Sequence, residues 1–288
     1  MTTQIIGYPL PSGPATVLYA PKTPATGISL QQISAGWIAW SEYLDKFTAK
    51  DTKLFALARG GSTPILIDDM TVHGTLAAST DMTLDGADIY WTLPLVENGV
   101  WHGRLMRQHL PDGPPTVAVQ APLGAIIGWP SVWAGMLAYE QTSQTGLPQD
   151  HVMLRFPDGH TQQIGTAATS EPTLGDGFLA YKTAERYDQG DLAAYRFADG
   201  TTLPLGHGEH PQVSGPYVTW LSQTPLDTIV RLARPLVGCV DKLSEKPISG
   251  IGDPFVGAGM LSWVSRSTAD AQLFYAPITL TAGSPCAP

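Results

Sequence analysis

The chain has 288 residues, 16 of them basic and 25 acidic, and its hydrophobic share of 43% is enough for a packed core. This balance excludes charge-driven disorder, and the net charge of -9 argues against a nucleic-acid partner, which needs clustered Lys and Arg. With 30 glycines and 25 prolines the chain has few places for long helices, so we expect a turn-rich β protein.

The N-terminal segment shows no basic region followed by an apolar run, so we expect no signal peptide within residues 1–30. Residues 4–10 and 15–19 resemble two short strands around a proline-containing turn. No strand precedes them, and a closed sheet arrangement must cover its edges. We therefore expect residues 1–25 to complete a sheet whose other strands lie elsewhere in the chain.

A short pattern recurs along the rest of the chain: a small turn residue, an apolar position, a spacer and an aromatic residue. The terminal aromatics are 51, 48, 42, 39 and 43 residues apart, which is the period of a four-stranded propeller blade. We expect these aromatics to pack between neighbouring sheets. They are Trp40, Trp91, Tyr139, Tyr181, Trp220 and Trp263.

Each repeat has further parts in a constant order, which we call strands A to D. A segment led by proline precedes the aromatic, and we place that proline at the first residue of strand A, where no ladder donor is needed. After strand B, a polar B–C loop leads to an alternating apolar strand C, a glycine-containing turn and a last short strand D. The leading prolines are Pro130, Pro172, Pro211 and Pro254, and the predicted loops include residues 92–103.

The pattern predicts an all-β fold, a six-bladed β-propeller of four-stranded antiparallel blades. Seven blades are the alternative count, and a face-to-face sandwich is the alternative fold. We expect residues 1–288 to form a single propeller domain in which residues 1–25 supply the closing strands. The longest uncharged run, residues 113–139, is broken by prolines and glycines, so we expect short strands there and no membrane span.

The repeats resemble those of TolB-type β-propellers, which read W-S-P-D-G-x-x-I-A-F. The nearest match is Thr83–Trp91, although the S-P-D-G tetrad is nowhere intact. Two segments, Pro211–Trp220 and Pro254–Trp263, are also similar to the P-x-V-x-G-x-x-V-x-W repeats of bacterial and archaeal surface proteins. The resemblance covers roughly residues 26–280. It implies the fold and is a poor guide to function, because such propellers include binding scaffolds, lyases and protease companion domains.

The B–C loops and D–A connections of a propeller gather on one face, where we expect function to concentrate. These loops combine aromatic side chains with carboxylates, a pairing that suits sugar or peptide recognition. The alternative is a solvated loop whose aromatics cover blade edges. The ligand-binding candidates are Glu42, Tyr43, Phe47, Trp101, His102, Glu140, Arg186 and Tyr187.

A possible metal site lies on the connection that enters the fifth repeat. His207, Glu209 and His210 form the densest cluster of metal-ligating residues, but Gly208 and Pro211 exclude the helix of a zincin motif. We expect no cofactor unless a divalent metal binds this cluster. A glycosidase or lyase would need two acidic groups, or an acid and a base, that converge on the channel, and the candidates are Glu42, Glu140, Asp176 and Glu209.

The chain has two cysteines, Cys239 and Cys286, too few for a cysteine-built metal site. A disulfide between them would join the C-terminus to the preceding repeat and add about 4 kcal/mol in the loop-entropy account. Two unpaired thiols are the equal alternative.

Taken together, these features predict a non-catalytic, monomeric propeller outside the cytoplasm that binds a protein, peptide or glycan through its loop face. The alternative is an enzyme that acts on a polysaccharide or small metabolite through carboxylates and His, with or without a metal. A purely structural surface module is the third hypothesis.

Overall fold

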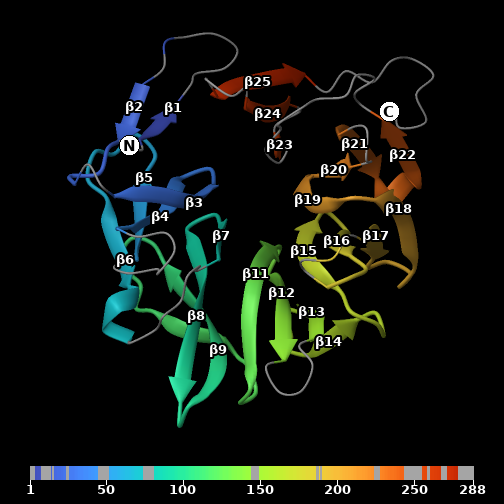
Figure 1. The fold of residues 1–288 in the computed structure, drawn as a ribbon, viewed down its shortest axis with the longest axis horizontal. Coiled ribbons are helices and arrows are strands. Elements are labelled where there is room, and N and C mark those ends of the chain that lie inside the picture. Colours follow the sequence, from blue (N-terminus) through green and yellow to red (C-terminus); the bar gives the residue numbers. More distant parts are fainter. Residues whose placement is uncertain are drawn as a thin grey trace. The chain divides into compact units, whose positions relative to one another are not determined.

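The fold is built almost entirely of antiparallel strands (Figure 1). The computed structural model describes residues 4–7, 14, 16–23, 26–44, 52–73, 81–143, 149–185, 188, 190–223, 228–242, 255–257, 260–266 and 271–277. Within these residues there are five four-stranded sheets, one three-stranded sheet and one two-stranded sheet. No helix in this part of the chain is long and apolar enough to cross a membrane.

The chain divides into two compact units. One consists of Met1–Pro130 with Gln144–Gly146, and the other of Ser131–Ser143 with Leu147–Pro288. The first unit contains a two-stranded sheet, then two four-stranded sheets whose strands pair in chain order. Its strands are β1 (Ile5–Gly7), β2 (Thr16–Tyr19), β3 (Gly27–Ile33), β4 (Trp37–Tyr43), β5 (Lys53–Ala58), β6 (Ile65–Asp69), β7 (Met82–Asp85), β8 (Asp88–Glu97), β9 (Val100–His109) and β10 (Thr116–Gln120), with the short 3-10 helix η1 (Met70–His73) after β6.

The second unit continues the same plan, and β11 (Ala125–Trp133) runs into it from the first. Three four-stranded sheets and one three-stranded sheet follow one another in chain order. The strands are β12 (Met136–Ser143), β13 (Gln149–Arg155), β14 (Thr161–Ile164), β15 (Ser170–Gly175), β16 (Phe178–Lys182), β17 (Asp191–Arg196), β18 (Thr202–His207), β19 (Glu209–Ser214), β20 (Tyr217–Gln223), β21 (Thr228–Arg234), β22 (Cys239–Lys242), β23 (Phe255–Gly257), β24 (Met260–Arg266) and β25 (Ala271–Pro277), with the 3-10 helix η2 (Pro235–Val237) before β22.

The aromatic anchors lie where the repeat predicts them, on the second strand of each sheet. Five are at most 4% exposed: Trp40, Trp91, Tyr139, Tyr181 and Trp220. The side chain of the sixth, Trp263 on β24, lies outside the described residues.

Consecutive sheets pack face against face through these side chains. In the first unit, Ala39 and Leu54 share one core cluster with Trp91 of the next sheet. In the second, Phe178 of β16 packs in a cluster with Val218 and Trp220 of β20. Because a single sheet of this kind cannot bury both faces, each depends on its neighbours for its core.

The predicted N-terminal strands are present as β1 and β2. They pair with each other in a two-stranded sheet, with Ile5 opposite Tyr19. Ile5 and Tyr19 belong to the core cluster around Trp40. The number of blades and closure of a ring by residues 1–25 stay predictions.

One predicted loop is wrong. Residues 92–103 form the ends of the ten-residue strands β8 and β9, which pair along their whole length, so that Val96 lies opposite Trp101. A two-residue turn joins them, with positive φ of 51° at Asn98 and 77° at Gly99. Asn-Gly is the sequence that this tight hairpin turn favours, so Asn98-Gly99 is the local signal for a hairpin within residues 92–103.

The placement of the prolines is also wrong. Pro130, Pro172 and Pro211 lie inside β11, β15 and β19 instead of at their first residues. The register shifts around the proline where β15 pairs with β16 and where β19 pairs with β20, and each shift marks a bulge. A bulge accommodates proline because the extra residue leaves the ladder locally unpaired.

Close packing of β9 on β11 leads to a stability prediction. A Cβ at Gly103 would lie 2.5 Å from the backbone N of Ile127 and 2.9 Å from the Cα of Ile126. Backbone atoms cannot move aside as a side chain can, so Gly103→Ala should lower the free energy of unfolding by about 1–3 kcal/mol in chemical denaturation. Gly36→Ala is the matched control, because a Cβ there meets nothing within 4 Å. Equal effects of the two substitutions would contradict this packing.

Candidate functional site

A cavity of about 660 Å³ lies in the first unit, a size typical of small-ligand sites. Its wall combines the end of β2 and the connection to β3 with one residue each of β4 and β5 and with the turn before β6. The described residues that line it are Val17, Leu18, Tyr19, Ala20, Lys22, Thr23, Thr26, Glu42, Phe55, Ser62, Thr63 and Pro64.

Glu42 is the one acidic side chain among these lining residues. Its Oε1 accepts a hydrogen bond of 3.0 Å from the indole Nε1–H of Trp40, two residues earlier on β4. The Tyr19 hydroxyl is a second hydrogen-bond partner. Burial raises the pKa of Tyr19, and the hydrogen bond to Glu42 and the negative charge of that carboxylate raise it further. Two aromatic donors therefore hold the carboxylate at the cavity wall.

Three aromatic rings support this wall. The Trp40 ring contacts the rings of Tyr19, at a centroid distance of 4.7 Å, and of Phe55, at 5.9 Å. Trp40 is fully buried, whereas Tyr19 and Phe55 line the cavity. The buried repeat anchor thus contacts two aromatic residues of the cavity wall and donates a hydrogen bond to its carboxylate.

The neighbouring candidate Tyr43 has a structural contact instead. It pairs with Gly27 of β3, and a Cβ at Gly27 would lie 2.5 Å from the Tyr43 ring. The ring therefore covers a backbone position that only glycine leaves open. The cavity also includes D–A connection residues such as Thr23, while the contribution of the turn at Ser62 was not foreseen from the sequence.

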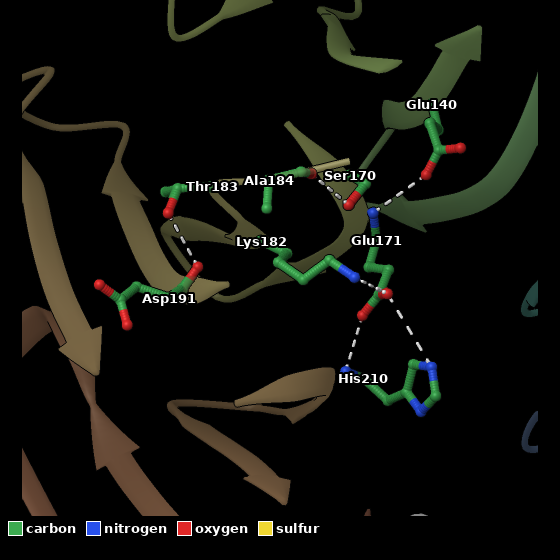
Figure 2. A network of polar contacts seen from close by, with 8 residues as sticks. All are labelled: Glu140, Ser170, Glu171, Lys182, Thr183, Ala184, Asp191 and His210. Carbon is green, nitrogen blue, oxygen red and sulfur yellow. Dashed lines mark hydrogen bonds and ion pairs between the residues drawn. The ribbon is translucent and has the colours of Figure 1, made fainter. Parts of the chain in front are cut away.

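The second unit contains a buried polar network (Figure 2). Lys182 Nζ of β16 lies 2.6 Å from Glu171 Oε1 of β15, and both side chains are 0% exposed. Glu171 Oε2 accepts a 2.7 Å hydrogen bond from the backbone N–H of His210, whose ring Nε2 is 3.9 Å from Oε1. Glu140, a ligand-binding and catalytic candidate, is also 0% exposed, and its Oε2 accepts a 3.2 Å bond from the backbone N–H of Glu171.

The same contact recurs in the first unit. Trp129 donates its backbone N–H to Asp81 Oδ2 at 3.0 Å. Trp129, Glu171 and His210 each precede a proline within the first strand of a sheet, and each has a positive φ, of 46°, 54° and 52°. Such a conformation is unfavourable for a residue with a side chain, and proline further restricts the residue before it. In all three cases a carboxylate from the preceding repeat accepts the N–H that this strained backbone exposes.

The predicted metal ligands have separate partners. His207 Nδ1 lies 3.4 Å from Asp191 Oδ1, and His210 faces Glu171. Among the described residues, no group of three or more His, Cys, Asp or Glu is placed to hold a metal ion. A divalent metal at His207, Glu209 and His210 stays an untested prediction.

The remaining candidates are distributed over the fold. Trp101 is half-buried on β9, and His102 beside it is buried, with its Nδ1 3.2 Å from Gln120 Nε2. Asp176 lies in the turn after β15, where its backbone N–H donates to Gly215 O at 3.3 Å. Phe47, Arg186 and Tyr187 lie outside the described residues.

Cys239, at the start of β22, is disulfide-bonded. Cys286 lies outside the described residues, so its pairing with Cys239 stays a prediction.

Comparisons with solved structures identify the fold. The β-propeller domain of the trilobed protease from Pyrococcus furiosus, described as having an open velcro topology, is 10% identical with a TM-score of 0.62, over 88% of this chain and 85% of that one. TolB from Acinetobacter baumannii is 13% identical with a TM-score of 0.54, over 85% of this chain and 60% of that one. The chain has a TolB-like β-propeller fold.

A prolyl endopeptidase is 11% identical with a TM-score of 0.67, over 94% of this chain. The present chain spans 46% of the length of that peptidase and 60% of the length of the Acinetobacter TolB. No protein-family model and no curated protein matches the sequence. At such low identities the likeness shows the fold alone.

The buried pair of the second unit gives a testable prediction. Lys182→Met leaves the Glu171 carboxylate buried without its cation, which should lower the free energy of unfolding by about 3–5 kcal/mol. Adding Glu171→Gln removes the unpaired charge and keeps an oxygen acceptor for His210, so the double variant should recover part of the loss. Thermal and chemical denaturation measure the stability of the single and the double variant. A Lys182→Met variant as stable as the wild type would contradict the role assigned to the pair.

Proposed function

We propose that this TolB-like propeller is a non-catalytic binding module that acts outside the cytoplasm as a monomer. Its ligand is a peptide or glycan segment, presented by a partner protein or a surface, which enters the cavity of the first unit. The single observation that carries the proposal is this cavity of about 660 Å³, whose wall includes a hydrogen-bonded carboxylate and two aromatic residues.

Two features support binding over catalysis. Glu140 and Glu171 are both fully buried, and each accepts a hydrogen bond from a backbone N–H, so neither carboxylate is free to meet a substrate. In the cavity, Glu42 is the one acid among the described lining residues, whereas glycoside hydrolysis uses two carboxyl groups across the scissile bond.

The location outside the cytoplasm rests on two observations. The charged fraction is only 14%, and TolB is among the proteins of similar fold. An enzyme acting on a polysaccharide or small metabolite is the alternative that the same experiment decides.

Screening of a glycan array and a random displayed peptide library tests the proposal, with wild-type protein and Ser62→Trp compared. Ser62 lines the cavity and is exposed, so an indole there should fill the hollow without disturbing the core. We expect the wild type to retain specific ligands and Ser62→Trp to lose them. Thr166→Trp is the control, because Thr166 is exposed and is not part of the cavity wall.

Three results would overturn the proposal. They are retention of no ligand by the wild type, equal binding by Ser62→Trp, and chemical conversion of a retained ligand.

A further inference from the structure

We propose that the cavity of the first unit recognises an alkylammonium group, as carried by a lysine side chain of a peptide. The ammonium would contact the Glu42 carboxylate, and its methylene chain would lie along the Tyr19 and Phe55 rings. This inference rests on the proposed binding function and names the chemical class of the ligand.

The charge of Glu42 is the first argument. Its two hydrogen-bond partners, Trp40 Nε1–H and the Tyr19 hydroxyl, are both neutral groups. In the described part of the chain no ion pair is formed by Glu42, although Lys53 lies opposite it in the strand pairing and instead binds Asp69 at 2.9 Å. The carboxylate at the cavity wall is thus held by two hydrogen bonds and forms no ion pair with any described residue.

The surrounding rings are the second argument. Aromatic faces attract ammonium ions through the ring quadrupole, and a cation beside several rings is the usual arrangement for alkylammonium ligands. Here Tyr19 and Phe55 line the same cavity as Glu42, and their contacts with buried Trp40 hold them in place. A neutral sugar could also contact this wall and donate its hydroxyls to the carboxylate, but only a cationic ligand would bring a charge opposite to that of Glu42.

Lys22 is the opposing charge on the cavity wall. It is exposed, and no ion pair joins it to Glu42 within the described residues. For a cationic ligand Lys22 is a source of repulsion, so its removal should strengthen binding. For a zwitterionic or anionic ligand it would be a partner, and its removal should weaken binding.

The Trp40 indole offers a direct reporter. Its Nε1–H donates to Glu42, so a cation at Glu42 should shift the Trp40 indole resonance in an NMR titration. The Trp91 indole donates at 2.8 Å to Asp68, which is not among the lining residues, and serves as the internal control.

The experiment titrates the full chain with acetyl-Gly-Lys-Gly-amide and with its norleucine analogue, which has a methyl group where lysine has an ammonium. Butylamine and a neutral disaccharide are the further probes. We expect the lysine peptide to shift the Trp40 indole and not the Trp91 indole, and the norleucine analogue to shift neither. If the lysine peptide binds more tightly than butylamine, the ligand is supported as a peptide. If the two bind equally, the claim of a peptide ligand is overturned, whereas recognition of the ammonium group stands.

Variants complete the test. Glu42→Gln keeps an oxygen for the Trp40 N–H but removes the charge. It should weaken binding of the lysine peptide by at least about tenfold. Lys22→Ala should strengthen it. Glu97→Gln is the matched control for net charge and should leave binding unchanged, because Glu97 is an exposed acid near His102 and outside the cavity wall.

Several results overturn the inference. If the norleucine peptide or the disaccharide binds as well as the lysine peptide, or if Glu42→Gln binds undiminished, the ammonium is not the recognised group while the binding function stands. If no probe shifts the Trp40 indole, the ammonium inference fails, and the array comparison with Ser62→Trp decides the binding function separately.

Discussion

The backbone N–H that precedes a proline in the first strand of a sheet is the group on which the arrangement of successive repeats depends. At Trp129, Glu171 and His210 the chain adopts a left-handed conformation within a strand. A carboxylate from the preceding repeat accepts each N–H, namely Asp81, Glu140 and Glu171. A hydrogen bond from an N–H to a carboxylate is stronger than one to a neutral acceptor. Contact with the preceding repeat therefore offsets the backbone strain within each strand.

Glu171 shows how these contacts are linked. Its own N–H is held by Glu140, and its carboxylate holds His210. Lys182 pairs with the buried carboxylate of Glu171. The acids of this network therefore serve the architecture, whereas Glu42 keeps its charge at the wall of a cavity. The same residue type has two different roles, and the difference lies in burial and in the presence of a cation.

The sequence predicts the repeat and the strand order well, because both depend on patterns that recur every 39 to 51 residues. Five anchors are buried as their spacing predicts, from Trp40 to Trp220. The bulges could not be predicted in the same way. Local rules place the residue before a proline in an extended conformation, and the carboxylate that stabilises the alternative lies 31 to 48 residues away in the sequence.

Prediction of the site was partial for a related reason. The sequence predicts Glu42 as a ligand-binding residue because it is an acid beside aromatics, and the structure places it in a cavity with Tyr19 and Phe55. Those two residues lie on other strands, β2 and the adjacent β5, and their sequence pattern indicates only strand packing. The same pattern predicts Glu140 as a ligand-binding residue, but Glu140 is buried. Sequence proximity to aromatics therefore does not distinguish a cavity wall from a sheet interior.

Amide hydrogen exchange measured by NMR on the native protein tests the central claim most directly. The account predicts that the N–H groups of Trp129, Glu171 and His210 exchange slowly, near the rate set by global unfolding, because each is held by a carboxylate within the packed repeats. The amide of Thr166, in an exposed bend, should exchange rapidly. Exchange of the three amides as fast as that of Thr166 would contradict the account.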